Sequence, residues 1–142
     1  MKKTFLAIIT VGYCLAAAAQ QDNYTLHIRK AQMPMILDGK LDEADWQNAD
    51  VAKSFKLSFP NDTAFSNWPT EAKVTFDDEF LYVGAVCFEL KEDYTVQSLK
   101  RDYGGGTSDV INITLDPSKD GLNGFIFSVS PLNVQREGLV NN

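Results

Sequence analysis

The chain has 142 residues, of which 44% are hydrophobic and 23% are charged, a composition that suits a compact domain with a single core. Nineteen acidic residues outnumber thirteen basic ones, so the net charge is −6. This excess of acid argues against nucleic acid as a partner, because few cations are available to neutralise phosphates, and no basic stripe is present to hold an anionic membrane surface.

The start of the chain has the three regions of a signal peptide. Lys2 and Lys3 form the positive region, an apolar run covers 5–15, and small residues follow at 16–19. The apolar run is shorter than the roughly 20 residues that cross a bilayer, so no membrane span is predicted. We expect cleavage after Ala19 and export to the periplasm, outer membrane or cell surface of a Gram-negative bacterium.

The two cysteines have different expected roles. A lipid anchor at Cys14 is disfavoured because Tyr13 stands where lipid attachment needs a small residue. After cleavage Cys87 is alone, so the core must hold without an internal disulfide. Cys87 lies in the apolar run 80–88, and we expect it to be a small buried hydrophobe.

After the signal peptide, a lead-in over 20–32 contains the first predicted strand. Residues 24–29 alternate apolar and polar, which is typical of a half-buried strand. Helical spacing of apolar residues then predicts one short helix near 42–49, with Asp42 as its N-cap and Trp46 in the core.

The middle of the chain predicts strands separated by polar segments. A strand is expected over 51–59, and a polar loop follows at 60–69. Residues 71–76 and 80–90 are strongly patterned strands joined by an acidic turn at 77–79. They predict an antiparallel hairpin.

The last third predicts a second hairpin. A loop at 91–108 leads to a strand over 109–115, and a polar turn at 116–123 leads to a strand over 124–130. Residues 134–142 then end without a capping element, where a further hairpin strand would be expected.

This organisation predicts an all-β fold, specifically an antiparallel β-sandwich with one short helix, and argues against βαβ units. We expect the sandwich to cover 33–142 and to be incomplete at its C-terminus. A C-terminal domain of the same longer chain would then follow it. The alternative is a sandwich that lacks strands.

The sequence offers few residues in arrangements that are typical of catalytic sites. His27 is the one histidine, and on an alternating strand it is more typical of a surface residue than of a general base. The acidic residues cluster in turns and at a helix start, where carboxylates accept backbone N–H groups. An enzyme acting through acidic pairs is therefore the least favoured hypothesis.

The segment 116–121 resembles the first half of a calcium loop, with oxygen ligands at alternate positions and then glycine. Phe127 stands where the bidentate glutamate of such a loop belongs. A metal-free hairpin turn is the preferred interpretation, and structural calcium held by Asp116 and Asp120 with a remote partner is the alternative.

Two aromatic residues in polar loops, Trp68 and Tyr103, are candidates for stacking on sugar rings. Packing of their loops against the sandwich is an equally favoured interpretation.

Several motifs occur together in one order. They include DGKLDEADW at 38–46, TEAKVTFDD at 70–78 and FLYVG at 80–84, followed by segments 101–102, 109–116 and 124–129. From about residue 33 to its end, the chain resembles the family 9 carbohydrate-binding modules, in the version at the N-terminus of large exported Bacteroidetes proteins.

The resemblance implies a β-sandwich with a sugar slot framed by aromatic residues and with calcium ions as structural ties. Sugar-binding members have a stacking tryptophan just before the strand that corresponds to 109–115, where Tyr103 or the glycine run stands here. Their glutamate aligns with Asn112 and their arginine with Ser128. Asn112 is therefore the expected hydroxyl-binding residue.

The leading hypothesis is a non-catalytic carbohydrate-binding module of a larger exported protein that binds glycans or takes part in polysaccharide breakdown. Its partner would be a polysaccharide or oligosaccharide. The alternative is a structural or docking domain in front of an outer-membrane β-barrel, with sugar binding lost.

Overall fold

A computed structural model describes residues 24–59, 62–89, 94–104, 106 and 108–141. The predicted signal peptide and its cleavage at Ala19 lie outside the described residues. The chain divides into two compact units, and each is considered by itself. Unit 1 comprises Met1–Ala52 and Ala72–Gly84, and unit 2 comprises Lys53–Glu71 and Ala85–Asn142.

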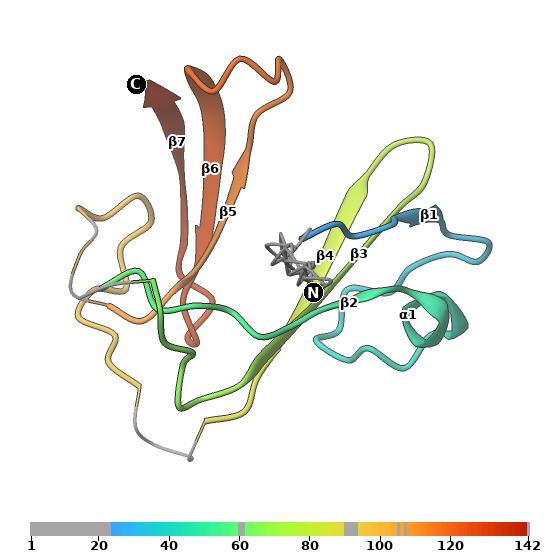
Figure 1. The fold of residues 1–142 in the computed structure, drawn as a ribbon, viewed down its shortest axis with the longest axis horizontal. Coiled ribbons are helices and arrows are strands. Elements are labelled where there is room, and N and C mark those ends of the chain that lie inside the picture. The colour runs from blue at the N-terminus through green and yellow to red at the C-terminus, as the bar shows by residue number, and fades with distance from the viewer. Residues whose placement is uncertain (1–23, 60–61, 90–93, 105, 107, 142) are drawn as a thin grey trace, which may run out of the picture. The chain divides into compact units, whose positions relative to one another are not determined.

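The prediction of an all-β chain is confirmed, since the described residues form two sheets and one short helix (Figure 1). The first sheet is built around β3, which pairs with each of its other three strands. Its strands are β1 (Arg29–Lys30), β2 (Val51–Ala52), β3 (Thr70–Phe76) and β4 (Leu81–Cys87). The β3–β4 pair corresponds to the hairpin predicted from the alternating pattern.

The second sheet lies in unit 2 and is a plain antiparallel meander in the order β5-β6-β7. Its strands are β5 (Ile111–Leu115), β6 (Asn123–Val129) and β7 (Gln135–Asn141). β7 lies within 134–142, where a further hairpin strand is expected from the sequence. It pairs with β6 along its whole length, from Gln135 opposite Val129 to Asn141 opposite Asn123.

The helix α1 (Ala44–Asn48) is shorter than predicted and starts differently. Trp46 is buried, with 4% of its surface exposed, which confirms it as a core residue. The expectation that Asp42 caps the helix is wrong, because the N-cap is Glu43 and no side chain caps this end. The Glu43 carboxylate instead accepts the backbone N–H of Ile36 at 2.9 Å.

Two predicted strands are mostly absent. Of the strand expected over 24–29 only Arg29 belongs to β1, and β1 runs parallel to β3. The strand expected over 51–59 ends after Ala52, because Ser54 takes a left-handed conformation (φ 60°) that an extended ladder does not allow.

Cys87 is exposed at the end of β4, so the expectation of a buried position is wrong. Burial on this strand is concentrated at its centre, on Gly84, and its last two residues face solvent. The apolar composition of β4 did not show at which residue its side chains become exposed to solvent.

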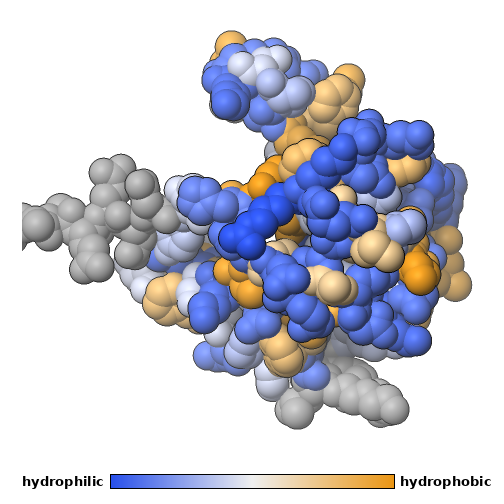
Figure 2. Space-filling model, turned by 90° about the vertical axis from the view of Figure 1, so that its right-hand side faces the viewer, coloured by the Kyte–Doolittle hydropathy of each residue, from blue (hydrophilic) through white to orange (hydrophobic). Residues whose placement is uncertain are grey.

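Buried apolar side chains are few in the described part of the chain: Trp46 in unit 1 and Val134 in unit 2. Large apolar residues also reach the surface, and Figure 2 shows them among hydrophilic residues on the visible face. Within the residues that the structure describes, no helix is both long and apolar enough to cross a membrane.

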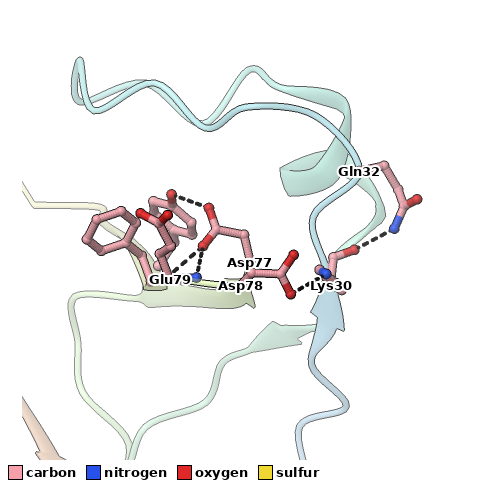
Figure 3. Close-up of polar contacts among 7 residues, drawn as sticks. Lys30, Gln32, Asp77, Asp78 and Glu79 are labelled. Carbon is pink, nitrogen blue, oxygen red and sulfur yellow. Dashed lines mark hydrogen bonds and ion pairs between the residues drawn. The ribbon is translucent and has the colours of Figure 1, made fainter.

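The turn between β3 and β4 is organised by one carboxylate (Figure 3). Asp77 accepts the backbone N–H groups of Glu79 at 2.8 Å and Phe80 at 2.7 Å, and the hydroxyl of Tyr82 at 2.7 Å. These bonds, that from Tyr82 above all, hold the pKa of Asp77 below its ordinary value. The neighbouring Asp78 instead reaches Lys30 of β1 at 2.5 Å.

Replacing Asp77 by Asn should lower the melting temperature at pH 7. Because the pKa is lowered by folding, the ionised carboxylate stabilises the fold above the unfolded-state pKa of about 4. That contribution is lost as pH falls through the lower folded-state pKa, so the difference between wild type and variant in thermal melts should shrink as the pH is lowered below about 4. Asp78→Asn is the matched control and should have a smaller effect, since exposed ion pairs contribute little. Equal effects at both positions would contradict this role of Asp77.

Two glycines of the second sheet should respond differently to alanine. A Cβ at Gly124 would lie 2.7 Å from the backbone oxygen of Leu115, whereas a Cβ at Gly138 would meet nothing closer than Ile126 Cγ2 at 3.5 Å. Gly124→Ala should therefore destabilise the chain by about 1–3 kcal/mol, the usual cost of overpacking against an atom that cannot move aside. Gly138→Ala should be near neutral. Chemical denaturation would measure both, and comparable losses would refute the steric explanation.

Candidate functional site

The register of the second sheet separates its side chains onto two faces, because successive residues of a strand point to opposite sides. One face carries a row formed by Asn112 of β5, Ser128 of β6 and Arg136 of β7. We call this side the polar face. Ile126 also lies on it, and Thr114 lies opposite Ile126.

The other side, which we call the apolar face, carries most of the hydrophobic residues of the three strands. They are Ile111, Ile113 and Leu115 of β5, Phe125, Phe127 and Val129 of β6, and Leu139 of β7. Several are substantially exposed, with 45% of Phe125, 42% of Phe127 and 70% of Leu139 accessible.

The central bond of the polar face joins Ser128 to Asn112. The Ser128 hydroxyl donates to Asn112 Oδ1 at 2.6 Å, and Ser128 itself is 7% exposed. Because the amide oxygen of Asn112 accepts this bond, its NH2 group remains to donate to a ligand. Asn112 is exposed, so this donor is accessible from solvent.

Arg136 completes the row in a half-buried position. Within the described residues its guanidinium makes no hydrogen bond or ion pair, although the chain's other two arginines both pair with carboxylates: Arg29 with Asp50, and Arg101 with Glu137. Its same-face neighbours in the register, Ser128 and Gly138, carry no charge. The polar face therefore presents an amide donor and an unpaired cation in the same row.

Arg101, unlike Arg136, is fully paired, and its partners lie along the apolar face. Its guanidinium donates to Gln135 Oε1 at 2.9 Å and to Glu137 Oε1 at 2.6 Å, and its Nε lies 3.4 Å from Asp102. The hydrogen bond that Arg101 donates to Glu137 is the main reason that the pKa of Arg101 is raised. Every nitrogen of this side chain is engaged within the protein.

The same segment protects the outer edge of β7. The backbone N–H of Asp102 donates to Gln135 O at 3.1 Å, and its carboxylate accepts the N–H of Glu137 at 3.2 Å. Asp102 adopts a left-handed conformation (φ 56°). A cavity of about 220 Å³ is lined by Arg101 and Glu137 of this cluster and also by Ser128 and Arg136, among others.

The two predicted stacking residues occupy separate places. Trp68 lies in the loop before β3 and is 42% exposed, with its backbone N–H bonded to Ser66 Oγ at 3.1 Å. Tyr103 is half-buried and follows Asp102 at the edge of β7. Among the described residues no hydrogen bond or ring contact joins Trp68, Tyr103 and Asn112.

The predicted calcium residues act as acceptors within the β5–β6 turn. Asp116 accepts the N–H of Gly121 at 2.9 Å, and Asp120 accepts those of Leu122 at 2.8 Å and Asn123 at 3.1 Å. These backbone bonds lower the pKa of each carboxyl. No group of three or more His, Cys, Asp or Glu residues that could hold a metal occurs in the described ranges.

Sequence reasoning missed Arg136, the cation of the polar face. The signal was present as the alternation of residues 135–141, but it is weak because Gly138 interrupts it and polar residues occur at both parities. Ser128 was identified only by alignment with an arginine of the resembled family. In the structure, Arg136 lies directly across from Ser128 on the next strand.

Comparisons of the chain with protein-family models, with curated proteins and with solved structures found no match in any of the three. The functional interpretation therefore depends on the geometry of the sheet and on the sequence motifs.

If Asp116 and Asp120 serve the turn rather than a metal, a chelator should leave the melting temperature of the chain unchanged, and added calcium should not raise it. Asp116→Ala should lower the melting temperature equally with and without calcium, because the lost bond is to the backbone of Gly121. Differential scanning fluorimetry measures both. A calcium-dependent rise that Asp116→Ala abolishes would establish a metal site.

Proposed function

We propose that the chain is a non-catalytic carbohydrate-binding module of an exported protein, and that the polar face of the second sheet is its binding surface. The observation that carries the proposal is the Ser128–Asn112 hydrogen bond at 2.6 Å, which engages the oxygen of an exposed amide and leaves its NH2 group to donate. A fixed planar donor suits sugar hydroxyls, because little rotamer entropy is lost when it binds.

The position of this bond supports the proposal independently of any aromatic residue. Asn112 and Ser128 are the two positions that align with the ligand-contacting glutamate and arginine of the resembled modules. The register makes them direct cross-strand partners, and Arg136 lies next in the same row. The positive charge of the family's arginine would thus be supplied from the adjacent strand.

A docking domain is the second candidate, and the apolar face favours it. Phe125, Phe127 and Leu139 are each between 42% and 70% exposed on neighbouring strands. Contiguous exposed apolar residues are uncommon on monomeric proteins, and where they occur they often mark a surface that binds another protein. In this alternative the protein partner would cover the apolar face, and the polar face would bind no sugar.

Affinity gel electrophoresis of the full chain on a panel of soluble polysaccharides tests the proposal. Wild type should be retarded by at least one glycan, and Asn112→Ala should weaken that retardation by about five- to tenfold in Kd, the effect of one lost hydrogen bond and its partner. Asn141→Ala is the matched control, because this asparagine lies at the far end of β7. Trp68→Ala and Tyr103→Ala would show whether either aromatic residue contributes.

Absence of retardation on every polysaccharide would exclude sugar binding and leave the docking domain. Unchanged retardation of Asn112→Ala would place the binding surface elsewhere on the chain.

A further inference from the structure

The charge of the polar face suggests which sugars it would select. Arg101 and Arg136 are both on β7 or beside it, but only Arg101 is neutralised, by Glu137 and Asp102. Arg136 is half-buried and has no carboxylate partner in the described part of the chain. Partial burial of an unpaired guanidinium is unfavourable, and an anion that completes its hydrogen bonds would relieve this cost.

The neighbours of Arg136 suit the same kind of ligand. The oxygen of the exposed Asn112 amide already accepts from the Ser128 hydroxyl, so the amide's NH2 group is the part of it that remains for a ligand, and this group is a donor. No acidic residue of β5, β6 or β7 lies on the polar face, because Glu137 has the opposite parity. An anionic group placed on this row meets an amide donor and one positive charge, and the acidic residue next to Arg136, Glu137, is itself paired with Arg101.

We infer that the polar face binds anionic glycans, which carry carboxylate or sulfate groups, and that Arg136 is the residue that determines this specificity. The inference rests on the proposed carbohydrate-binding function and names its ligand class. Arg is suited to this role because its planar fork can donate two parallel hydrogen bonds to a carboxylate or sulfate.

The negative net charge of the chain keeps non-specific binding to acidic polysaccharides low, so the inference can be tested directly. At −6 the chain repels polyanions, so non-specific attraction does not produce retention. Retention of this chain by an acidic polysaccharide therefore requires a local site.

Two matched pairs of glycans separate charge from sugar identity in affinity gels of the full chain. Polygalacturonate is compared with its methyl ester, which removes the carboxylate, and dextran sulfate is compared with dextran, which lacks the sulfate. The charged member of at least one pair should bind about tenfold or more tightly than its neutral partner. The pair that responds distinguishes a uronate from a sulfate ester.

Variants at Arg136 identify the residue responsible. Arg136→Gln should abolish the preference for the charged member, and Arg136→Lys should retain part of it, since the charge remains but the fork is lost. Lys100→Gln is the control of equal charge change in the same unit and should behave as wild type. The melting temperature of each variant is measured to check that it folds. If Arg136→Gln does not fold, Arg136→Lys still tests whether this side chain sets the preference.

Equal binding of charged and neutral members, or an unchanged preference in Arg136→Gln and Arg136→Lys, would overturn the inference and leave the proposed function intact. No retardation by any glycan of this or the wider panel would overturn the proposed function itself.

Discussion

The antiparallel register between β5, β6 and β7 is the constraint on which the candidate site depends. It places Asn112 opposite Ser128 and Ser128 opposite Arg136, and a shift of one residue would send one of these side chains to the apolar face. The turn after β6 helps to fix the register, since Val134 N–H donates to Ser130 Oγ and Ser130 N–H donates to Val134 O. The buried Val134 anchors the same turn.

The sheet deals with charge in two different ways. On the apolar face the guanidinium of Arg101 donates to Gln135 and Glu137. The carboxylate of the neighbouring Asp102 accepts the backbone N–H of Glu137 at the outer edge of β7. This arrangement neutralises the cation and blocks part of an otherwise open edge, a common protection against strand addition. On the polar face Arg136 has no carboxylate partner among the described residues, and it takes no part in covering the edge of β7. Because Arg101 is neutralised and Arg136 is not, the positive charge of this sheet is available on the polar face.

Three acidic residues of this protein serve as turn acceptors. Asp77, Asp116 and Asp120 each accept backbone N–H groups, and their pKa values are lowered for that reason. A carboxylate with a lowered pKa is a poor general acid at neutral pH. These three acidic residues thus have a structural explanation in the turns that they organise.

The sequence by itself determined the all-β class, the β3–β4 hairpin, the turns around Asp77 and Asp116, and the burial of Trp46, because period-two patterns and turn residues are local signals. It did not determine where strands end, as Ser54 and the exposed Cys87 show. Only the tertiary structure decided which side chains meet: Arg101 with Glu137, 36 residues later, and Asn112 with Ser128 and Arg136. Alternation states which residues of one strand share a face, whereas the pairing between strands is fixed by long-range hydrogen bonds that no local pattern encodes.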